Sequence, residues 1–245
     1  MRKGFAVNLK PHTKVNSSLS AFFSGNRCFL CALPCGGREA ICFGCLSDLS
    51  LNINACLGCA KPHTASRTCS DCLGHPWVFI DNSWAMFQYH YPSTRLIQHM
   101  KFKQGIDIAY ALGRALAGLS IYDRTPAPEC IIPVPLHTSR LVARGYNQSV
   151  ELARPLSKRL GIQLDTASCK RVRPTKPQSD MTAKQRKKNV RDAFSVFEGI
   201  SYGHVLLVDD VITTGSTVNE LARTLRLAGV NKVDVLVCAR ASKTY

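Results

Sequence analysis

The chain has 245 residues, of which 45% are hydrophobic, so it can bury a substantial core and is not a disordered tail. Its 32 lysines and arginines outnumber the 16 acidic residues, and the formal net charge of +16 indicates a polyanionic or phosphate-rich partner. The longest stretch without a charged residue, 82–94, is shorter than the ~18 residues of a membrane-spanning helix, so no membrane insertion is expected.

Residues 1–27 are polar and lack a hydrophobic pattern, and they are predicted to form a leader rather than a folded domain. No secretory signal is visible near the start of the sequence, so we expect a cytoplasmic protein. In that reducing compartment, paired cysteines more often bind metal than form disulfides.

Residues 28–75 are rich in cysteine and poor in apolar runs, and a segment of this kind needs a cross-link to fold. Eight of its cysteines form four C-x-x-C pairs, with ten, ten and nine residues between successive pairs. Each pair supplies two thiolates, and two pairs complete a tetrahedral Zn²⁺ site. The spacing therefore predicts a double zinc ribbon with two structural zinc ions, bound by Cys28, Cys31, Cys42, Cys45, Cys56, Cys59, Cys69 and Cys72.

The spacing says less about which pairs combine. We prefer sequential pairing, first with second and third with fourth, whereas interleaved pairing stays open on spacing alone. Cys35 lies off the regular spacing and could compete as a ligand. Disulfides or free thiols are the alternative to zinc.

Residues 76–245 alternate between strand-like and helix-like segments. Strands are predicted over 84–89, 130–134, 205–208 and 233–238. Helices are predicted to begin at Ser93 and to span 108–119, 150–160 and 215–227, with Pro155 as a flaw in the third of these. This alternation predicts an α/β fold, with a parallel sheet flanked by helices.

The strongest chemical signal is VLLVDDVITTGSTVNE, residues 205–220, in which an apolar strand ends in Asp209 and Asp210. A loop then opens a helix, and ligands of open α/β sheets bind beyond the carboxyl ends of the strands. Backbone N–H groups at the start of a helix suit a phosphate, while neighbouring carboxylates suit ribose hydroxyls or Mg²⁺. The loop residues are Thr213, Thr214, Gly215, Ser216 and Thr217. The plainer alternative is a strand, turn and helix whose N-cap is Thr or Ser.

This stretch resembles the 5-phosphoribosyl 1-diphosphate (PRPP) motif of type I phosphoribosyltransferases. The resemblance implies that Asp209 and Asp210 bind the ribose hydroxyls as catalytic residues and that the loop cradles the 5′-phosphate, with Mg²⁺ accompanying PRPP. Thr213 stands where several purine-salvage enzymes have a carboxylate, so purine salvage is not expected.

A basic region lies between residues 139 and 191, with 14 lysines and arginines against three acids, and thus +11 of the net charge. Within residues 131–153, the pattern PVPL…R…RGYNQ resembles the ComF/GntX-like family, as does LIQHMKFKQG near Lys101. This resemblance covers about residues 28–240. It implies that a loop after the strand at 130–134 holds the pyrophosphate of PRPP, with Arg140, Arg144, Lys101 and Lys103 as candidates.

The basic charge exceeds what one PRPP molecule requires, so single-stranded DNA is the natural second partner. Aromatic residues are scarce in this region, so we expect electrostatic, sequence-independent binding. Residues 170–191 have the composition of a mobile flap, and a solvated charged face is the alternative interpretation. The candidate DNA-binding residues are Arg171, Arg173, Lys184, Arg186, Lys187 and Lys188.

The resemblance implies a cytoplasmic role in natural competence, in which the protein handles incoming single-stranded DNA and either turns over or senses Mg²⁺-PRPP. The alternative is a phosphoribosyltransferase of nucleotide metabolism that releases pyrophosphate and has no direct DNA role. A PRPP-responsive regulator is a third and weaker hypothesis, because the sequence has no helix-turn-helix pattern. A homodimer is expected by analogy with isolated type I domains.

Overall fold

The computed structural model describes residues 27–36, 39–62, 68–74, 77–102, 105–119, 126–174, 189–197 and 199–241. Most of the predicted leader and most of the predicted flap therefore lie outside the described residues. So do five of the candidate site residues, namely Lys103, Lys184, Arg186, Lys187 and Lys188.

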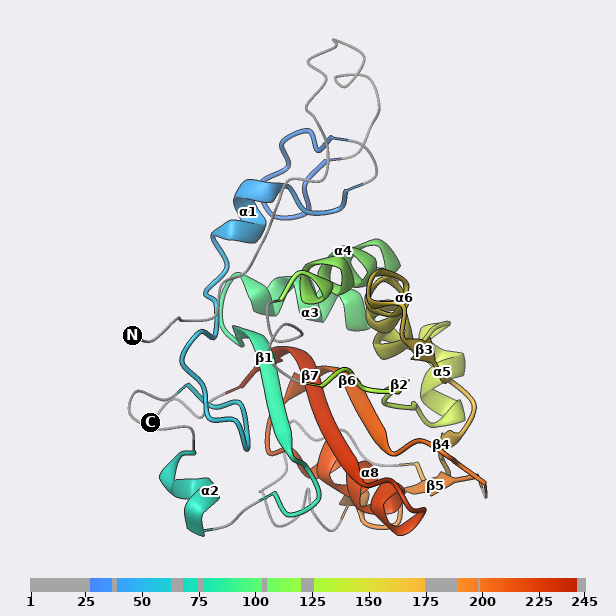
Figure 1. The fold of residues 1–245 in the computed structure, drawn as a ribbon. Coiled ribbons are helices and arrows are strands. Elements are labelled where there is room, and N and C mark those ends of the chain that lie inside the picture. Colours follow the sequence, from blue (N-terminus) through green and yellow to red (C-terminus); the bar gives the residue numbers. More distant parts are fainter. Residues whose placement is uncertain are drawn as a thin grey trace.

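A five-stranded parallel sheet forms the centre of the fold (Figure 1), as the alternating sequence pattern predicts. Its strand order is β1-β7-β6-β2-β3, and every neighbouring pair is parallel. The strands are β1 (Asn82–Gln88), β2 (Cys130–Pro133), β3 (Gln163–Leu164), β6 (His204–Ile212) and β7 (Lys232–Arg240). The middle strands are apolar throughout their centres because helices cover both faces of the sheet.

The two faces of the sheet carry different helices (Figure 1). Leu206 and Val208 of β6 belong to the core under α3 (Ser93–Phe102), α4 (Ile106–Ala117) and α6 (Gln148–Leu160). Val205 and Leu207, which alternate with them, belong to the core against α8 (Ser216–Leu227) on the opposite face. None of the helices among the described residues is long and apolar enough to cross a bilayer.

Helix α6 continues through Pro155 instead of breaking there. The proline ring lies where α6 crosses α4 closely, since a Cβ built on Gly113 would lie 2.6 Å from Pro155 Cγ. The helix ends at Gly161, which adopts a left-handed conformation with φ +68°. Tertiary packing against a glycine thus accommodates the residue that weakens the helix locally.

The structure adds elements that the sequence pattern does not predict. A short helix, α5 (Thr138–Arg144), follows β2, where the resemblance implied a loop. Two short strands, β4 (Cys169–Arg171) and β5 (Phe194–Val196), form a separate antiparallel pair. Both strands border the segment predicted as a flap, and their pairing depends on residues distant in the sequence.

The cysteine-rich segment runs along the outer edge of the sheet. Asn52 N–H donates to Met86 O at 2.9 Å and Gln88 N–H to Ser50 O at 3.1 Å, so residues 50–52 cover the edge of β1. Two short helices belong to this segment, α1 (Phe43–Ser47) and α2 (Ser70–Gly74), and they lie far apart in Figure 1. The cysteine pairs therefore do not gather in one place.

Candidate functional site

The two carboxylates lie within strand β6, not after its end as the sequence suggests. The strand continues to Ile212 because Val211 and Ile212 pair with Ala239 and Arg240 of β7. Asp209 and Asp210 therefore have fixed backbone positions near the carboxyl end of the sheet, where ligands of this class of fold bind.

Asp210 faces inward and is held by two side chains. It is 4% exposed, its Oδ1 lies 3.1 Å from Lys101 Nζ, and Gln148 Nε2 donates to its Oδ2 at 3.1 Å. Lys101 comes from α3 and Gln148 from the first turn of α6, so three elements meet at this carboxylate. Lys101 thus lies at the acidic pair, and its ammonium group is paired with a protein carboxylate.

Asp209 is half-buried and lines a cavity. Ser149 Oγ and the Asp210 backbone N–H each donate to its Oδ1 at 2.9 Å. Burial, and after it the negative charge of Asp210, raises the pKa of Asp209 to about 7. This carboxylate is therefore the member of the pair that can face a ligand and that changes its charge near neutral pH.

The cavity beside Asp209 is formed by the loop after β6 and the first residues of α8, which together (residues 213–217) are called the phosphate loop from here on. Its volume is about 50 Å³, and its lining is mostly polar. Gly215 caps α8 with φ +78°, a conformation that favours glycine. The first N–H groups of α8 have no acceptor within the helix, which makes this end suitable for an anion. The lining residues are Asp209, Val211, Ile212, Thr213, Gly215, Ser216, Thr217 and Val218.

Three arginines, Arg140, Arg144 and Arg171, lie near the acidic pair. Arg144 donates to Gln148 Oε1, and burial, together with the charge of Arg144, lowers the pKa of Arg140. Arg171 is only 8% exposed, and burial, followed by the charge of Arg140, lowers its pKa to about 10, while the charge of Asp209 opposes this shift. Arg171 therefore brings positive charge near Asp209, and Arg140 lies near both of the other arginines.

The position of Arg171 differs from the exposed surface expected of a DNA-binding residue. Strand β4 alternates between buried and exposed residues, so Cys169 and Arg171 point inward while Lys170 points outward. Arg173, the other described candidate for DNA binding, is exposed. Arg171 thus belongs with the charged groups of the site.

Sequence reasoning did not find Gln148, Ser149 or Arg240 as site residues. Gln148 and Ser149 are buried at the start of α6 although both are polar. Gln148 ends the RGYNQ pattern of the sequence and Ser149 follows it, but polar residues in the first turn of a helix are normally exposed, so their burial was not predicted. Arg240 carries no such signal, because its contacts come from distant segments.

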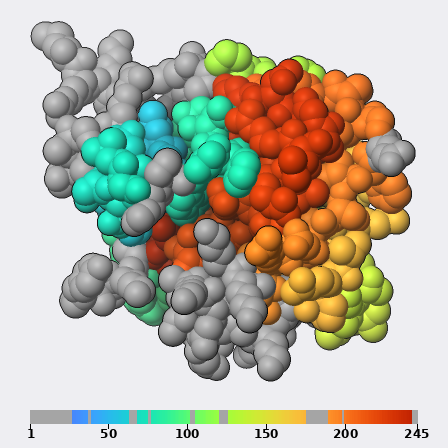
Figure 2. Space-filling view, turned by 90° about the horizontal axis from the view of Figure 1, so that it is seen from below, coloured from blue at the N-terminus to red at the C-terminus, as the bar shows by residue number. Residues whose placement is uncertain are grey.

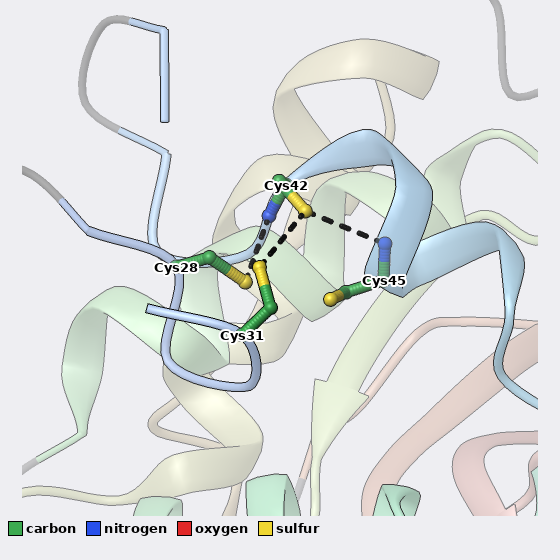
Figure 3. Close-up of side chains that lie close together, drawn as sticks. All are labelled: Cys28, Cys31, Cys42 and Cys45. Carbon is green, nitrogen blue, oxygen red and sulfur yellow. Dashed lines mark hydrogen bonds between the residues drawn. The ribbon is translucent and has the colours of Figure 1, made fainter. Parts of the chain in front are cut away.

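The cysteines form two groups, and the grouping is sequential. The first tetrad is Cys28, Cys31, Cys42 and Cys45, shown in Figure 3, and the second tetrad is Cys56, Cys59, Cys69 and Cys72. Within each tetrad, all four sulfur atoms lie within 4.8 Å of one another. Cys35 is buried and belongs to neither group.

The geometry of both tetrads fits zinc. Sulfur atoms of a tetrahedral site with Zn–S bonds of about 2.3 Å lie roughly 3.8 Å apart. The sulfurs of Cys31 and Cys42 are 3.8 Å apart, and those of Cys59 and Cys69 are 3.7 Å apart. Backbone N–H groups donate to Cys28 Sγ and Cys56 Sγ and, against the effect of burial, lower the pKa of these thiols to about 6 and about 7. Thiolates are the form that binds metal.

The parallel sheet, the carboxylate beside the phosphate loop and the two cysteine tetrads define a phosphoribosyltransferase-fold protein with possible zinc sites. The family model described as "Phosphoribosyl transferase domain" matches residues 146–245. The chain is 35% identical over 221 residues to "DNA utilization protein YhgH" of Escherichia coli strain K12, covering 87% of this chain and 96% of that protein.

Two further relatives carry competence names. The chain is 36% identical over 222 residues to "Competence protein F" of Haemophilus influenzae, covering 82% of this chain and 96% of that protein. It is 23% identical over 199 residues to "Competence protein ComFC" of Bacillus subtilis, covering 76% and 78%. The chain belongs to the ComF/YhgH family of competence and DNA utilization proteins.

Proposed function

We propose that the chain binds Mg²⁺-PRPP at the phosphate loop and binds single-stranded DNA through a separate basic surface. In this proposal the protein is cytoplasmic and handles incoming DNA during natural transformation. The observation that carries the proposal is the cavity in which the Asp209 carboxylate and the phosphate loop lie side by side. The match to a phosphoribosyl transferase domain and the names of the relatives support it.

Each part of PRPP has a matching group in the site. The Asp209 carboxylate can accept hydrogen bonds from ribose hydroxyls, and the phosphate loop can donate N–H and hydroxyl bonds to the 5′-phosphate. In this proposal the guanidinium groups of Arg140, Arg144 and Arg171, which act on one another electrostatically, attract the pyrophosphate group. Lys101, which the sequence analysis assigned to PRPP, is paired with Asp210 in the structure.

A magnesium ion that enters with PRPP would find a suitable donor in the carboxylate of Asp209, because carboxylate oxygens are ligands that Mg²⁺ prefers. The ion supplies positive charge to the pyrophosphate when bound. The three arginines supply charge to the same leaving group, and such cations lower the barrier to its departure. Release of pyrophosphate with an added acceptor is therefore the measurement that separates an enzyme from a ligand sensor.

Calorimetric titration of the zinc-loaded protein with Mg²⁺-PRPP tests the first half of the proposal. We expect Asp209→Asn to lower the affinity at least tenfold. Asp192→Asn is the matched control, because Asp192 is an exposed carboxylate paired with Arg223, and this change should leave the affinity within twofold. Equal affinity of wild type and Asp209→Asn would contradict the assignment.

Fluorescence anisotropy with labelled single-stranded DNA tests the second half. A variant with Lys184, Arg186, Lys187 and Lys188 changed to glutamine should bind DNA more weakly. Its salt dependence should also be less steep, by about 0.7 in log–log slope for each lost phosphate contact. PRPP affinity should be unchanged in this variant. DNA binding equal to that of the wild type would remove these residues from the proposal.

Two finer points belong to the same proposal. A cytoplasmic location keeps the tetrad thiols reduced and able to bind metal, and we expect two structural zinc ions per chain by mass spectrometry of metals. Zero zinc would exclude the metal assignment. A homodimer is proposed by analogy, and light scattering in solution measures it.

A further inference from the structure

The second tetrad and the phosphate loop are joined by one buried side chain, Arg240. This residue ends β7 and is 2% exposed. Its Nε donates to Cys59 O at 2.7 Å, and its Nη1 donates to Ile212 O at 3.0 Å and to Thr213 O. One guanidinium group therefore binds the backbone of a cysteine in the tetrad and the backbone at the entry to the phosphate loop.

The acceptors of Arg240 among the described residues are main-chain carbonyls, those above and that of Ala241. Four thiolates with one Zn²⁺ carry a net charge of −2, so a loaded second tetrad favours a buried cation beside it. The charge of Arg240 is thus best compensated when the tetrad holds metal.

Trp77 forms a second connection between the same two places. It packs against the four cysteines of the second tetrad, and its ring also lies against the phosphate loop, since a Cβ built on Gly215 would lie 2.1 Å from Trp77 Cη2. Arg240 Cζ lies 5.9 Å from the centre of the same ring. The segment that follows Trp77 reaches α8, where Asp81 accepts a hydrogen bond from Arg226. In Figure 2 the teal surface of this part of the chain borders the red surface of the C-terminal part.

The first tetrad packs elsewhere. Cys28 belongs to the core under α3 and α4, and the Phe29 ring lies 4.3 Å from the ring of His99 on α3. Arg114 of α4 pairs with Glu39. The chain therefore contains two metal-binding groups of the same composition, of which the second contacts the phosphate loop through Arg240 and Trp77.

We propose that metal in the second tetrad sets the shape of the phosphate loop through Arg240 and Trp77, so that Arg240 is a positioning residue for the loop. The inference rests on the proposed function in one respect, that the loop binds the phosphate of PRPP. Loss of metal from the second tetrad frees the backbone of Cys59 and removes the support of Arg240, and the loop then loses its binding shape. Metal in the first tetrad has no such effect.

The test compares Cys72→Ser and Cys45→Ser, each with one zinc per chain, in the full-length protein. Hydrogen exchange of residues 212–217 should be at least tenfold faster in Cys72→Ser than in wild type, and unchanged in Cys45→Ser. Affinity for Mg²⁺-PRPP should fall at least tenfold in Cys72→Ser only. Slow exchange in Cys72→Ser, or equal effects of both variants, would overturn the inference.

Arg240→Met keeps all eight cysteines of the two tetrads. It tests whether the second tetrad acts on the phosphate loop through Arg240, even if Cys72→Ser fails to fold. We expect two zinc ions per chain, with faster exchange of residues 212–217 and the same loss of PRPP affinity. Exchange at the wild-type rate would overturn the role of Arg240. If wild type itself does not bind Mg²⁺-PRPP, the proposed function fails, while the exchange measurements still decide whether the tetrad controls the loop.

Coupling between two sites is reciprocal, which gives one more readout on the unmodified protein. Zinc release to a chelator should occur in two phases, and Mg²⁺-PRPP should slow one of them. The slowed phase should be missing in Cys72→Ser and present in Cys45→Ser. A ligand that slows both phases or neither would contradict the coupling.

Discussion

Replacing Lys101 by methionine should destabilise the protein by an amount that grows with pH. The change keeps the length of the side chain and removes the ammonium group 3.1 Å from Asp210 Oδ1. Asp210 is 4% exposed, so its carboxylate cannot be rehydrated, and Gln148 is the side-chain donor that stays. An uncompensated carboxylate in such a place costs several kcal/mol unless it takes up a proton.

Protonation limits the size of the effect. Two unit charges at 3.1 Å attract one another by about 5 kcal/mol at an effective dielectric constant of 20. Proton uptake by a carboxyl of ordinary pKa near 4 costs about 1.4 kcal/mol per pH unit, or about 4 kcal/mol at pH 7 and about 1.5 kcal/mol at pH 5. With the hydrogen bond from Gln148 retained, we expect a loss of about 2–3 kcal/mol at pH 7 and of about 1 kcal/mol at pH 5.

The sign follows from proton binding in the two states. In the variant, the folded protein binds a proton at this carboxyl more readily than the unfolded chain, so its stability falls as pH rises above the ordinary carboxyl pKa. In the wild type, burial lowers the pKa of Lys101, but the charges of Asp210 and Asp209 outweigh this and raise it. Lys101 therefore keeps its charge in the folded wild type between pH 5 and pH 8, and the pH dependence of the loss comes from the carboxyl that the variant leaves without its cation.

Urea unfolding of the zinc-loaded protein, followed by circular dichroism at pH 5, 7 and 8, measures the effect. Lys61→Met is the matched control, because its partner Asp71 is 67% exposed, and it should cost less than about 1 kcal/mol at every pH. Adding Asp210→Asn to Lys101→Met should recover most of the loss. A cost no larger than that of Lys61→Met at pH 8, or one that does not shrink at pH 5, would refute the reasoning.

Three other changes test the site. The raised pKa of Asp209 makes its negative charge destabilising above the ordinary carboxyl pKa. Asp209→Asn should therefore stabilise the fold by about 1–2 kcal/mol at pH 8 and by less at pH 5, although PRPP binding is lost. Thermal unfolding at both pH values measures this difference. Gly215→Ala should lower the free energy of unfolding by about 1–3 kcal/mol and weaken PRPP binding, because the backbone has a φ of +78° and the new Cβ meets the Trp77 ring. Adding Trp77→Ala should remove the clash with the ring but not the backbone strain, as measured by urea unfolding. Arg171→Met should lower PRPP affinity in calorimetry and leave DNA affinity unchanged. Arg173→Met, at an exposed position, should lower DNA affinity and leave PRPP affinity unchanged. The opposite pattern would show that Arg171 binds DNA, as the sequence analysis expects.

Features that depend on consecutive residues could be predicted from the sequence alone. The apolar run 205–208 predicts a buried strand, and the segment that follows it supplies hydroxyl and backbone donors from adjacent positions. The spacing of the cysteine pairs also indicated two groups of four, because each C-x-x-C turn places two sulfurs together locally.

The pairing of the charged groups could not be predicted from the sequence, because it depends on how distant segments pack. Lys101 faces Asp210, Arg171 turns inward beside Arg140, and Arg240 reaches Cys59 across 181 positions of the sequence. A charged side chain has no periodicity that reveals its partner, and its exposure depends on which distant segments pack around it. Most residues of the site could therefore be predicted from the sequence. Its ion pairs, and the connection between the second tetrad and the phosphate loop, arise from the packing of the sheet with the segments at its edge.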